Sequence, residues 1–188
     1  MNLNEIDQKL ITDCINRNSK AEFELFRVCY SYLMSICIRY TKNEETAKEV
    51  LNIGFYKILS NLKKHKPDTP FKAWIRVVMV NTLINEYKKE KIHYSNVQYV
   101  EDYYETDKHS DINNAIKKIN ANDIYEMIAQ LPPASKQDFN LFYMDGFKHK
   151  EIAELLNITE GTSKWHLNSA KEKLKELINK TELQIKVS

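Results

Sequence analysis

Apolar residues in the first half of the chain recur every three or four positions, which is the spacing of one face of an α-helix. One such stripe covers residues 23–40 and begins with Phe23, a second covers residues 47–62, and a third covers residues 71–83. A weaker pattern lies at residues 6–15. Asn43 stands shortly before the second stripe, where its side chain can cap the helix. The pattern predicts four helices packed as one bundle, with these stripes as its core.

The second half of the chain begins with two shorter helical segments. A helix over residues 124–131 is stopped by Pro132 and Pro133, because proline removes a backbone donor and clashes with the preceding turn. Pro133 is also well placed at the start of the next helix. That helix is predicted to end at Gly146, which accepts the left-handed turn common after a helix.

Two further helices are predicted over residues 151–156 and 160–179, separated by a turn at residues 157–159. Asn157 tolerates a left-handed conformation in this turn, and Thr159 can cap the following helix. Lys148 stands where a Ser or Thr cap would be expected, so the start of the first of these helices should fray. The spacing is that of a helix-turn-helix, a motif that an ordinary helical hairpin can imitate.

The two halves are separated by residues 93–120, in which the apolar periodicity fails. Five acidic residues cluster around Lys108 here, which is typical of an acidic linker. The predicted fold is therefore all-α, with two small helical domains at residues 1–92 and 121–182. The linker joins them, and residues 183–188 form a tail.

Composition supports a helical, globular chain. The 188 residues (22.2 kDa) are 43% hydrophobic and 29% charged, and only three Gly and four Pro are present. Sandwiches, barrels and Gly-rich phosphate loops need more turn residues than this. The net charge of +2 means that any attraction to nucleic acid has to come from local patches.

The sequence has no pattern of a secretory signal or a membrane span, and its three cysteines fit neither a disulfide framework nor a zinc site. The first 18 residues mix charged with apolar side chains, and no apolar run approaches the ~20 residues of a membrane span. We therefore expect a cytoplasmic protein without stable membrane insertion. Cys14, Cys29 and Cys37 are odd in number and lie at helical positions, which favours buried thiols over disulfides or a zinc site. No cofactor and no metal site are expected.

A basic patch lies between the second and third stripes and along the third. Residues 63–91 contain eight Lys or Arg against three acidic residues, so phosphate attraction would concentrate there. Trp74, Asn81, Asn85 and Lys88 lie within about 60° of one another around the predicted helix. Such an aromatic, amide and cation stripe can hold an unpaired strand. The alternative readings are a core position for Trp74 and a solvated helix residue for Asn81.

A second group of candidate contacts lies in the N-terminal half of the helix at residues 160–179, the part of a helix-turn-helix that enters the major groove. Lys164 and Lys171 could pair with phosphate or guanine, and Asn168 could bridge N6 and N7 of adenine. His166 is expected on the same exposed side. It has no ligand partners that would make it a metal site.

Several short motifs in both halves resemble one known family. They are Ala21–Phe26, Ala47–Phe55, Phe71–Arg76 with Asn81 and Tyr87–Lys89, then Leu131–Pro133, Asp145–Phe147, Glu151–Leu156, Glu160–Thr162 and Ala170–Leu174. In this order, with an acidic spacer between the halves, the chain resembles RNA polymerase sigma factors of the extracytoplasmic-function (ECF) type. These are the small members of the sigma-70 family that keep only regions 2 and 4. The resemblance covers nearly the whole chain.

The resemblance implies a sigma factor that binds core RNA polymerase, recognises the −10 and −35 promoter elements and opens the promoter. Region 2 would contact the −10 element through Lys63, Lys64, Lys66, Asp68, Thr69, Phe71, Trp74, Arg76, Asn81, Asn85, Lys88 and Lys89. Region 4 would contact the −35 element through Thr162, Lys164, Trp165, His166, Asn168, Ser169 and Lys171. Core polymerase would be bound through Glu49, Asn52 and Phe55. The remaining expected partner is an anti-sigma factor.

The chain departs from the family pattern at three places. Asn52-Ile53-Gly54 precedes Phe55 where a Gln followed by an acid is usual, and Glu49 matches an acidic position. Ser163 replaces a Val, and Ser169 replaces an Arg that would contact phosphate. The expected consequence is an altered preference for, or a lower affinity to, the −35 element.

Three other functions are compatible with a helical chain. A dimeric helix-turn-helix regulator would bind duplex DNA tightly without polymerase. A helical enzyme is disfavoured because the sequence has no metal-ligand spacing, phosphate loop or nucleophile motif, although a catalytic triad can be scattered. A protein-interaction module without DNA contact is disfavoured by the two basic segments.

Overall fold

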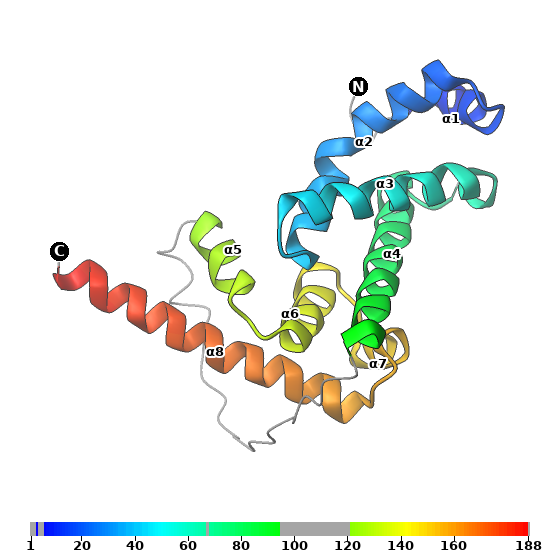
Figure 1. The fold of residues 1–188 in the computed structure, drawn as a ribbon. Coiled ribbons are helices and arrows are strands. Elements are labelled where there is room, and N and C mark those ends of the chain that lie inside the picture. Colours follow the sequence, from blue (N-terminus) through cyan, green and yellow to red (C-terminus); the bar gives the residue numbers. More distant parts are fainter. Residues whose placement is uncertain (1–2, 4–5, 67, 95–120, 188) are drawn as a thin grey trace. The chain divides into compact units, whose positions relative to one another are not determined.

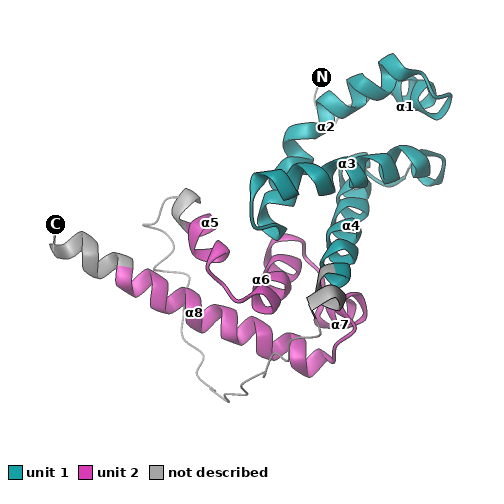
Figure 2. Cartoon of the chain, in the orientation of Figure 1, with its two compact units in different colours: residues 1–92 teal, residues 93–188 magenta. Residues whose placement is uncertain are grey.

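The computed structural model describes residue 3 and residues 6–66, 68–94 and 121–187, without the side chains of 90–94, 121–123 and 181–187. The chain divides into two compact units, residues 1–92 and 93–188 (Figure 2). All regular elements of the described ranges are helical (Figure 1), which confirms the predicted all-α class. The predicted acidic linker lies, from residue 95 on, outside the described residues.

Unit 1 contains the four predicted helices. They are α1 (Gln8–Ile15), α2 (Ser19–Tyr40), α3 (Glu44–Asn61) and α4 (Phe71–Tyr94), with a 3₁₀ turn, η1 (Leu62–Lys64), after α3. Asn43 caps α3 as predicted, since its side-chain oxygen accepts from the backbone N–H of Thr46 at 2.8 Å. The second helix begins at Ser19, before the predicted stripe, because Asn18 accepts from the N–H groups of Lys20 and Ala21.

The core of unit 1 is made by the inner faces of α2, α3 and α4. Phe26 of α2 and Phe55 of α3 pack edge to face with ring centroids 4.9 Å apart. Met79 of α4 lies against α2, with its Sδ 3.5 Å from Sγ of Cys37. Phe23 was predicted to belong to this core, and that prediction is wrong: its side chain is 69% exposed. Leu25 is fully buried, and a residue two positions away points to a nearly opposite side of a helix.

Unit 2 contains α5 (Ala121–Ala129), α6 (Pro133–Phe139), a π turn η3 (Asn140–Met144), α7 (His149–Leu156) and α8 (Glu160–Val187). Gly146 has φ +75° and Asn157 has φ +57°, so both predicted left-handed turns are present. Thr159 caps α8, because its Oγ1 accepts from the backbone N–H of Thr162 at 3.0 Å. The helix α8 extends beyond the predicted end at residue 179.

The start of α7 differs from the prediction. Fraying was expected because Lys148 occupies the cap position. In the structure the carboxylate of Glu151 accepts a hydrogen bond from the backbone N–H of Lys148 at 2.7 Å. This contact is one half of a capping box, and it compensates for the missing Ser or Thr.

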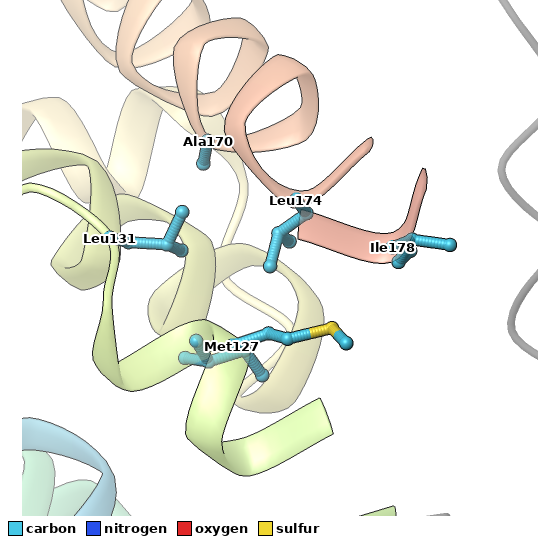
Figure 3. Packing of buried hydrophobic residues seen from close by; sticks show 6 residues of the cluster. Met127, Leu131, Ala170, Leu174 and Ile178 are labelled. Atoms are coloured by element: carbon cyan, nitrogen blue, oxygen red, sulfur yellow. The ribbon is translucent and has the colours of Figure 1, made fainter. Parts of the chain in front are cut away.

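An apolar cluster packs α5 and the residues just after it against α8 in unit 2. Figure 3 shows Ala170 and Leu174 of α8 directed towards Leu131 and Met127, and Ile178 of α8 also belongs to the cluster. Ile124, Phe139 and Leu177 pack against the cluster from its edge. These contacts hold the middle of α8, whereas side chains outside this cluster contact its first turns.

The three cysteines are free and buried, as predicted. Across the described residues, no helix is long and apolar enough to cross a membrane.

Candidate nucleic-acid interface

The outward face of α4 carries the predicted aromatic, amide and cation stripe. Trp74, Asn81 and Lys88 are half-buried and Asn85 is exposed. The opposite side of the helix holds the fully buried core residues, so the stripe follows from the turn of about 100° per residue. Val77 lies at the edge of the same face and is 47% exposed, an apolar addition to the stripe that was not predicted.

Three aromatic rings order the loop that precedes α4. The ring of His65 lies 5.4 Å from Phe71 and 5.3 Å from Trp74, and Phe71 and Trp74 are 5.8 Å apart. Nε2 of His65 donates to the backbone carbonyl of Thr69 at 2.8 Å. Trp74 is therefore neither a bundle-core residue nor a free one, because it packs against the loop. His65 was missed because its contacts join a loop to a helix start and produce no periodic signal.

The predicted cations of unit 1 fall into different environments. Lys63, Lys64 and Lys66 are exposed in η1 and the following loop, next to exposed Asp68. Lys89 is paired with Glu86 at 2.7 Å. Lys72 lies over the ring of Tyr32, 4.9 Å from its centroid. Arg76 is half-buried and lies about 140° around the helix from Asn81. Arg76 is thus separate from the stripe.

The first turns of α8 present a compact polar surface. Lys164 and Asn168 are exposed, and Trp165, beside them on the helix, is half-buried. Thr162 is half-buried, with its hydroxyl 2.9 Å from that of Thr159. Ser169 and Lys171 are also half-buried. The ammonium of Lys171 lies 5.9 Å from the centroid of the Tyr143 ring.

His166 was predicted on this exposed side, and that placement is wrong. Its side chain is buried, and its Nδ1 lies 2.5 Å from Oδ2 of Asp138 on α6. His166 sits one turn after Ser163, which is also buried. His166 is two positions from both exposed Lys164 and exposed Asn168, so helical spacing places it about 160° from each of them, on the inner side of α8. The buried carboxylate of Asp138 on α6 hydrogen-bonds to His166, which offsets the cost of removing the imidazole from water.

Unit 1 has another exposed surface on the outer side of α3. Two of the three predicted polymerase contacts lie on it, and the third does not. Glu49 and Asn52 are exposed as expected. Phe55 is only 7% exposed because it packs on Phe26, so it is a core residue and not a surface contact. The apolar residues that do reach the surface of α3 are Ile53 and Tyr56, which were not predicted.

Among the described residues, no group of three or more His, Cys, Asp or Glu side chains is arranged to hold a metal ion. The surfaces of α4 and α8 are instead suited to polar and stacking contacts with nucleic acid.

Family models match both units. Residues 25–92 match Sigma-70 region 2, and residues 121–174 match Sigma-70, region 4, so the two matches together cover more than half of the chain. The chain belongs to the sigma-70 family. It has regions 2 and 4 as two helical domains, the organisation of ECF sigma factors, and as a sigma factor it directs promoter recognition by RNA polymerase. The family consists of non-catalytic initiation factors, and the alternative of a dimeric regulator is not favoured.

Similar proteins of comparable length are also sigma factors. The chain is 22% identical over 183 residues to RNA polymerase sigma-H factor of Pseudomonas aeruginosa, covering 89% of this chain and 91% of that protein. It is 22% identical over 191 residues to RNA polymerase sigma factor SigV of Bacillus subtilis, covering 97% and 99%. Among solved structures, the sigma factor RpoE of Bartonella quintana in complex with the anti-sigma factor NepR has a TM-score of 0.50 and 14% identity. That match covers 83% of this sigma factor and 95% of the other chain, and it shows the shared fold.

Proposed function

We propose that α4 and the loop before it hold the melted −10 strand, while α8 reads the −35 element as duplex DNA. The observation that carries this proposal is that each unit exposes a helix face with amide, aromatic and cationic side chains. In unit 1 these are Trp74, Asn81 and Lys88, and in unit 2 Lys164, Trp165 and Asn168.

The −10 contact requires bases to leave the duplex. Unstacking costs a few kcal/mol for each base, and stacking on an aromatic side chain returns about 1–3 kcal/mol. Trp74 offers one such ring, and the exposed ammonium groups of Lys63, Lys64 and Lys66 supply phosphate attraction. The loop ordered by His65 would border the pocket for an extruded base. Asn81 and Asn85 add hydrogen-bonding groups for base edges.

The −35 contact requires groups that reach base edges in the major groove. Lys164 and Asn168 are exposed on the same side of α8, and half-buried Trp165 offers apolar surface beside them. An Asn can bind adenine through two hydrogen bonds, and a Lys can bind guanine or phosphate. Lys171 and the N-terminal end of α8 would contact phosphates at the edge of the groove. His166 takes no part in direct contact.

Core polymerase would be bound by the outer face of α3. Glu49 and Asn52 provide the polar part of this face, and Ile53 and Tyr56 provide an exposed apolar centre. Interfaces commonly combine an aromatic anchor with a polar rim. Phe55 would support the face from beneath through its contact with Phe26.

The sigma factor would act without catalytic groups of its own and in the cytoplasm, where core polymerase and promoter DNA are found. We also expect an anti-sigma factor as a regulatory partner. Support for this partner comes from the solved RpoE structure, which is a complex with the anti-sigma factor NepR.

Run-off transcription tests the proposal. Purified sigma factor is added to core polymerase with a library of genomic fragments, and the 5′ ends of the products are sequenced. Transcripts starting downstream of a common pair of sequence elements are expected. Run-off no higher than with core polymerase alone would contradict the function. Tight duplex binding without polymerase would instead support a dimeric regulator.

A further inference from the structure

A chain of polar side chains runs through the interior of unit 2 beneath the exposed residues of α8. Asp138 of α6 and Ser163 of α8 are fully buried, and His166 of α8 is 5% exposed. Oδ2 of Asp138 lies 2.5 Å from Nδ1 of His166, and the Ser163 hydroxyl donates to Oδ1 of Asp138 at 3.4 Å. Nδ1 of His149, at the start of α7, lies 3.0 Å from Oγ of Ser163. The four groups link the helices α6, α7 and α8.

One arrangement of protons satisfies this chain. An ionised carboxylate only accepts, so Ser163 and His166 both donate to Asp138. Ser163 has a single hydroxyl proton, so Nδ1–H of His149 donates to its oxygen. Burial lowers the pKa of His149, with the charge of Lys164 acting in the same direction, which favours a neutral imidazole. Each of these donors then has an acceptor, as a buried polar cluster requires.

These hydrogen bonds constrain the rotation of α8 more tightly than apolar packing does. Ser163 and His166 are one turn apart on the inner side of the helix and share one carboxylate. The apolar cluster of Figure 3 engages α8 from Ala170 to Ile178, along its middle, and Leu167 is the buried apolar residue of α8 nearest the hydrogen-bonded turn. Hydrogen bonds weaken steeply as their angles open, whereas apolar contacts have no preferred direction.

The anchored turn is also the turn that would face DNA. Lys164 and Trp165 lie between Ser163 and His166 in sequence, and Asn168 follows two residues later. A rotation of α8 would therefore displace all three together. We infer that Asp138, through Ser163 and His166, positions α8 for reading the −35 element. This inference rests on the proposed assignment of α8 to that element.

Three variants separate positioning from stability. Asp138→Leu leaves the donors of Ser163 and His166 buried without an acceptor, so it is expected to unfold the domain. The triple variant Asp138→Leu, Ser163→Ala, His166→Leu removes the carboxylate together with its two donors and leaves an apolar interior that can fold, and half-buried His149 can donate to solvent instead. Asp138→Asn keeps an acceptor for His166, and its amide can donate to Ser163 once that hydroxyl turns to His149.

The experiment uses holoenzyme reconstituted from core polymerase and the full chain, and a promoter fragment recovered by run-off. Its readout is the ratio of affinities for the fragment with its −35 element intact and with that element replaced by transversions. We expect the wild type and Asp138→Asn to share one ratio and the triple variant to lose about tenfold, the value of one base contact. Affinity for the replaced fragment should not change. Proton NMR should show a downfield Nδ1–H signal of His166 in the wild type and Asp138→Asn.

The outcomes separate a failure of the positioning role of Asp138 from a failure of the proposed −35 contact by α8. A folded triple variant that keeps the wild-type ratio, or a folded Asp138→Asn that loses it, overturns the positioning role and leaves the function intact. A wild-type ratio of one overturns the assignment of α8 to the −35 element and the inference with it. If the triple variant does not fold, Ser163→Ala replaces it. That variant keeps the bond between Asp138 and His166, and about a threefold loss is expected; an unchanged ratio overturns the inference.

Discussion

Gly54 of α3 lies directly against the end of the Met79 side chain of α4. A Cβ added to Gly54 would be 2.5 Å from Cε and 2.6 Å from Sδ of Met79. Met79 is fully buried and its sulfur also contacts Cys37, so it has little room to move. The glycine therefore sets how closely α3 and α4 can approach, and with it the placement of the outward face of α4.

Gly54→Ala should destabilise unit 1 by about 1 kcal/mol. Ala is a better helix former than Gly by about 1 kcal/mol, but forcing a methyl group into a packed interior costs about 1–3 kcal/mol. Urea unfolding measures the difference. In a Met79→Val background, which has neither a δ nor an ε atom to crowd the added methyl group, the same substitution should become neutral or stabilising. A stabilising effect of Gly54→Ala in the wild type would contradict the crowding argument.

Tyr56→Ala and Phe55→Ala should separate binding from folding on the same helix. Tyr56 is 67% exposed, so its removal is expected to leave stability within about 0.5 kcal/mol and weaken core polymerase binding about tenfold. Phe55 is buried, so its truncation should cost about 3–5 kcal/mol of folding free energy. Ile38→Ala, at an exposed apolar position on α2, is the control and should change neither quantity. Unaltered polymerase binding by Tyr56→Ala would exclude this face.

Lys164→Ala should weaken binding to the −35 element and lower the slope of log affinity against log salt by about one. The ammonium is exposed on the outer side of α8, and one lost phosphate contact releases one counterion fewer. Lys20→Ala removes the same charge from an exposed position at the start of α2 and serves as the control. Equal salt slopes for the two variants would count against a DNA contact by Lys164.

Trp74→Ala should reduce affinity of the holoenzyme for a single-stranded −10 oligonucleotide by about 1–3 kcal/mol. Trp74→Phe keeps an aromatic face and should retain most of the binding. Since Trp74 also packs on His65 and Phe71, the thermal unfolding of each variant is measured alongside. If Trp74→Ala and Trp74→Phe bind equally well, stacking by this residue is not part of −10 recognition.

The buried thiols should make stability fall in alkaline solution. Burial raises the pKa of Cys14 to about 11 and the pKa values of Cys29 and Cys37 to about 12, from an ordinary value of 9.0. The unfolded chain then binds fewer protons than the folded one above pH 9, so stability decreases as pH rises from there. Cys29 alone contributes about 1 kcal/mol between pH 9 and pH 10. Urea midpoints should therefore fall less steeply for Cys29→Ala, and parallel curves would refute the linkage.

Helix positions were predictable because they depend on neighbours in sequence. Asn43, Asn157 and Thr159 each act through backbone groups within a few residues, so their roles as caps and turn residues could be inferred before any contact was known. The stripe of Trp74, Asn81 and Lys88 followed from helical spacing in the same way. The family motifs added the order of the two domains.

Side-chain burial was decided by partners far away in sequence. Helical spacing already places His166 on the inner side of α8, but only the structure shows that Asp138, on another helix, supplies its hydrogen bond. Phe23 is exposed because α2 and α3 pack at one particular rotation, set by shape complementarity between many side chains, whereas Phe55 is buried as a member of the predicted stripe of residues 47–62. Local spacing thus determined which residues share a helix face, while long-range packing and directional hydrogen bonds determined which faces turn inward.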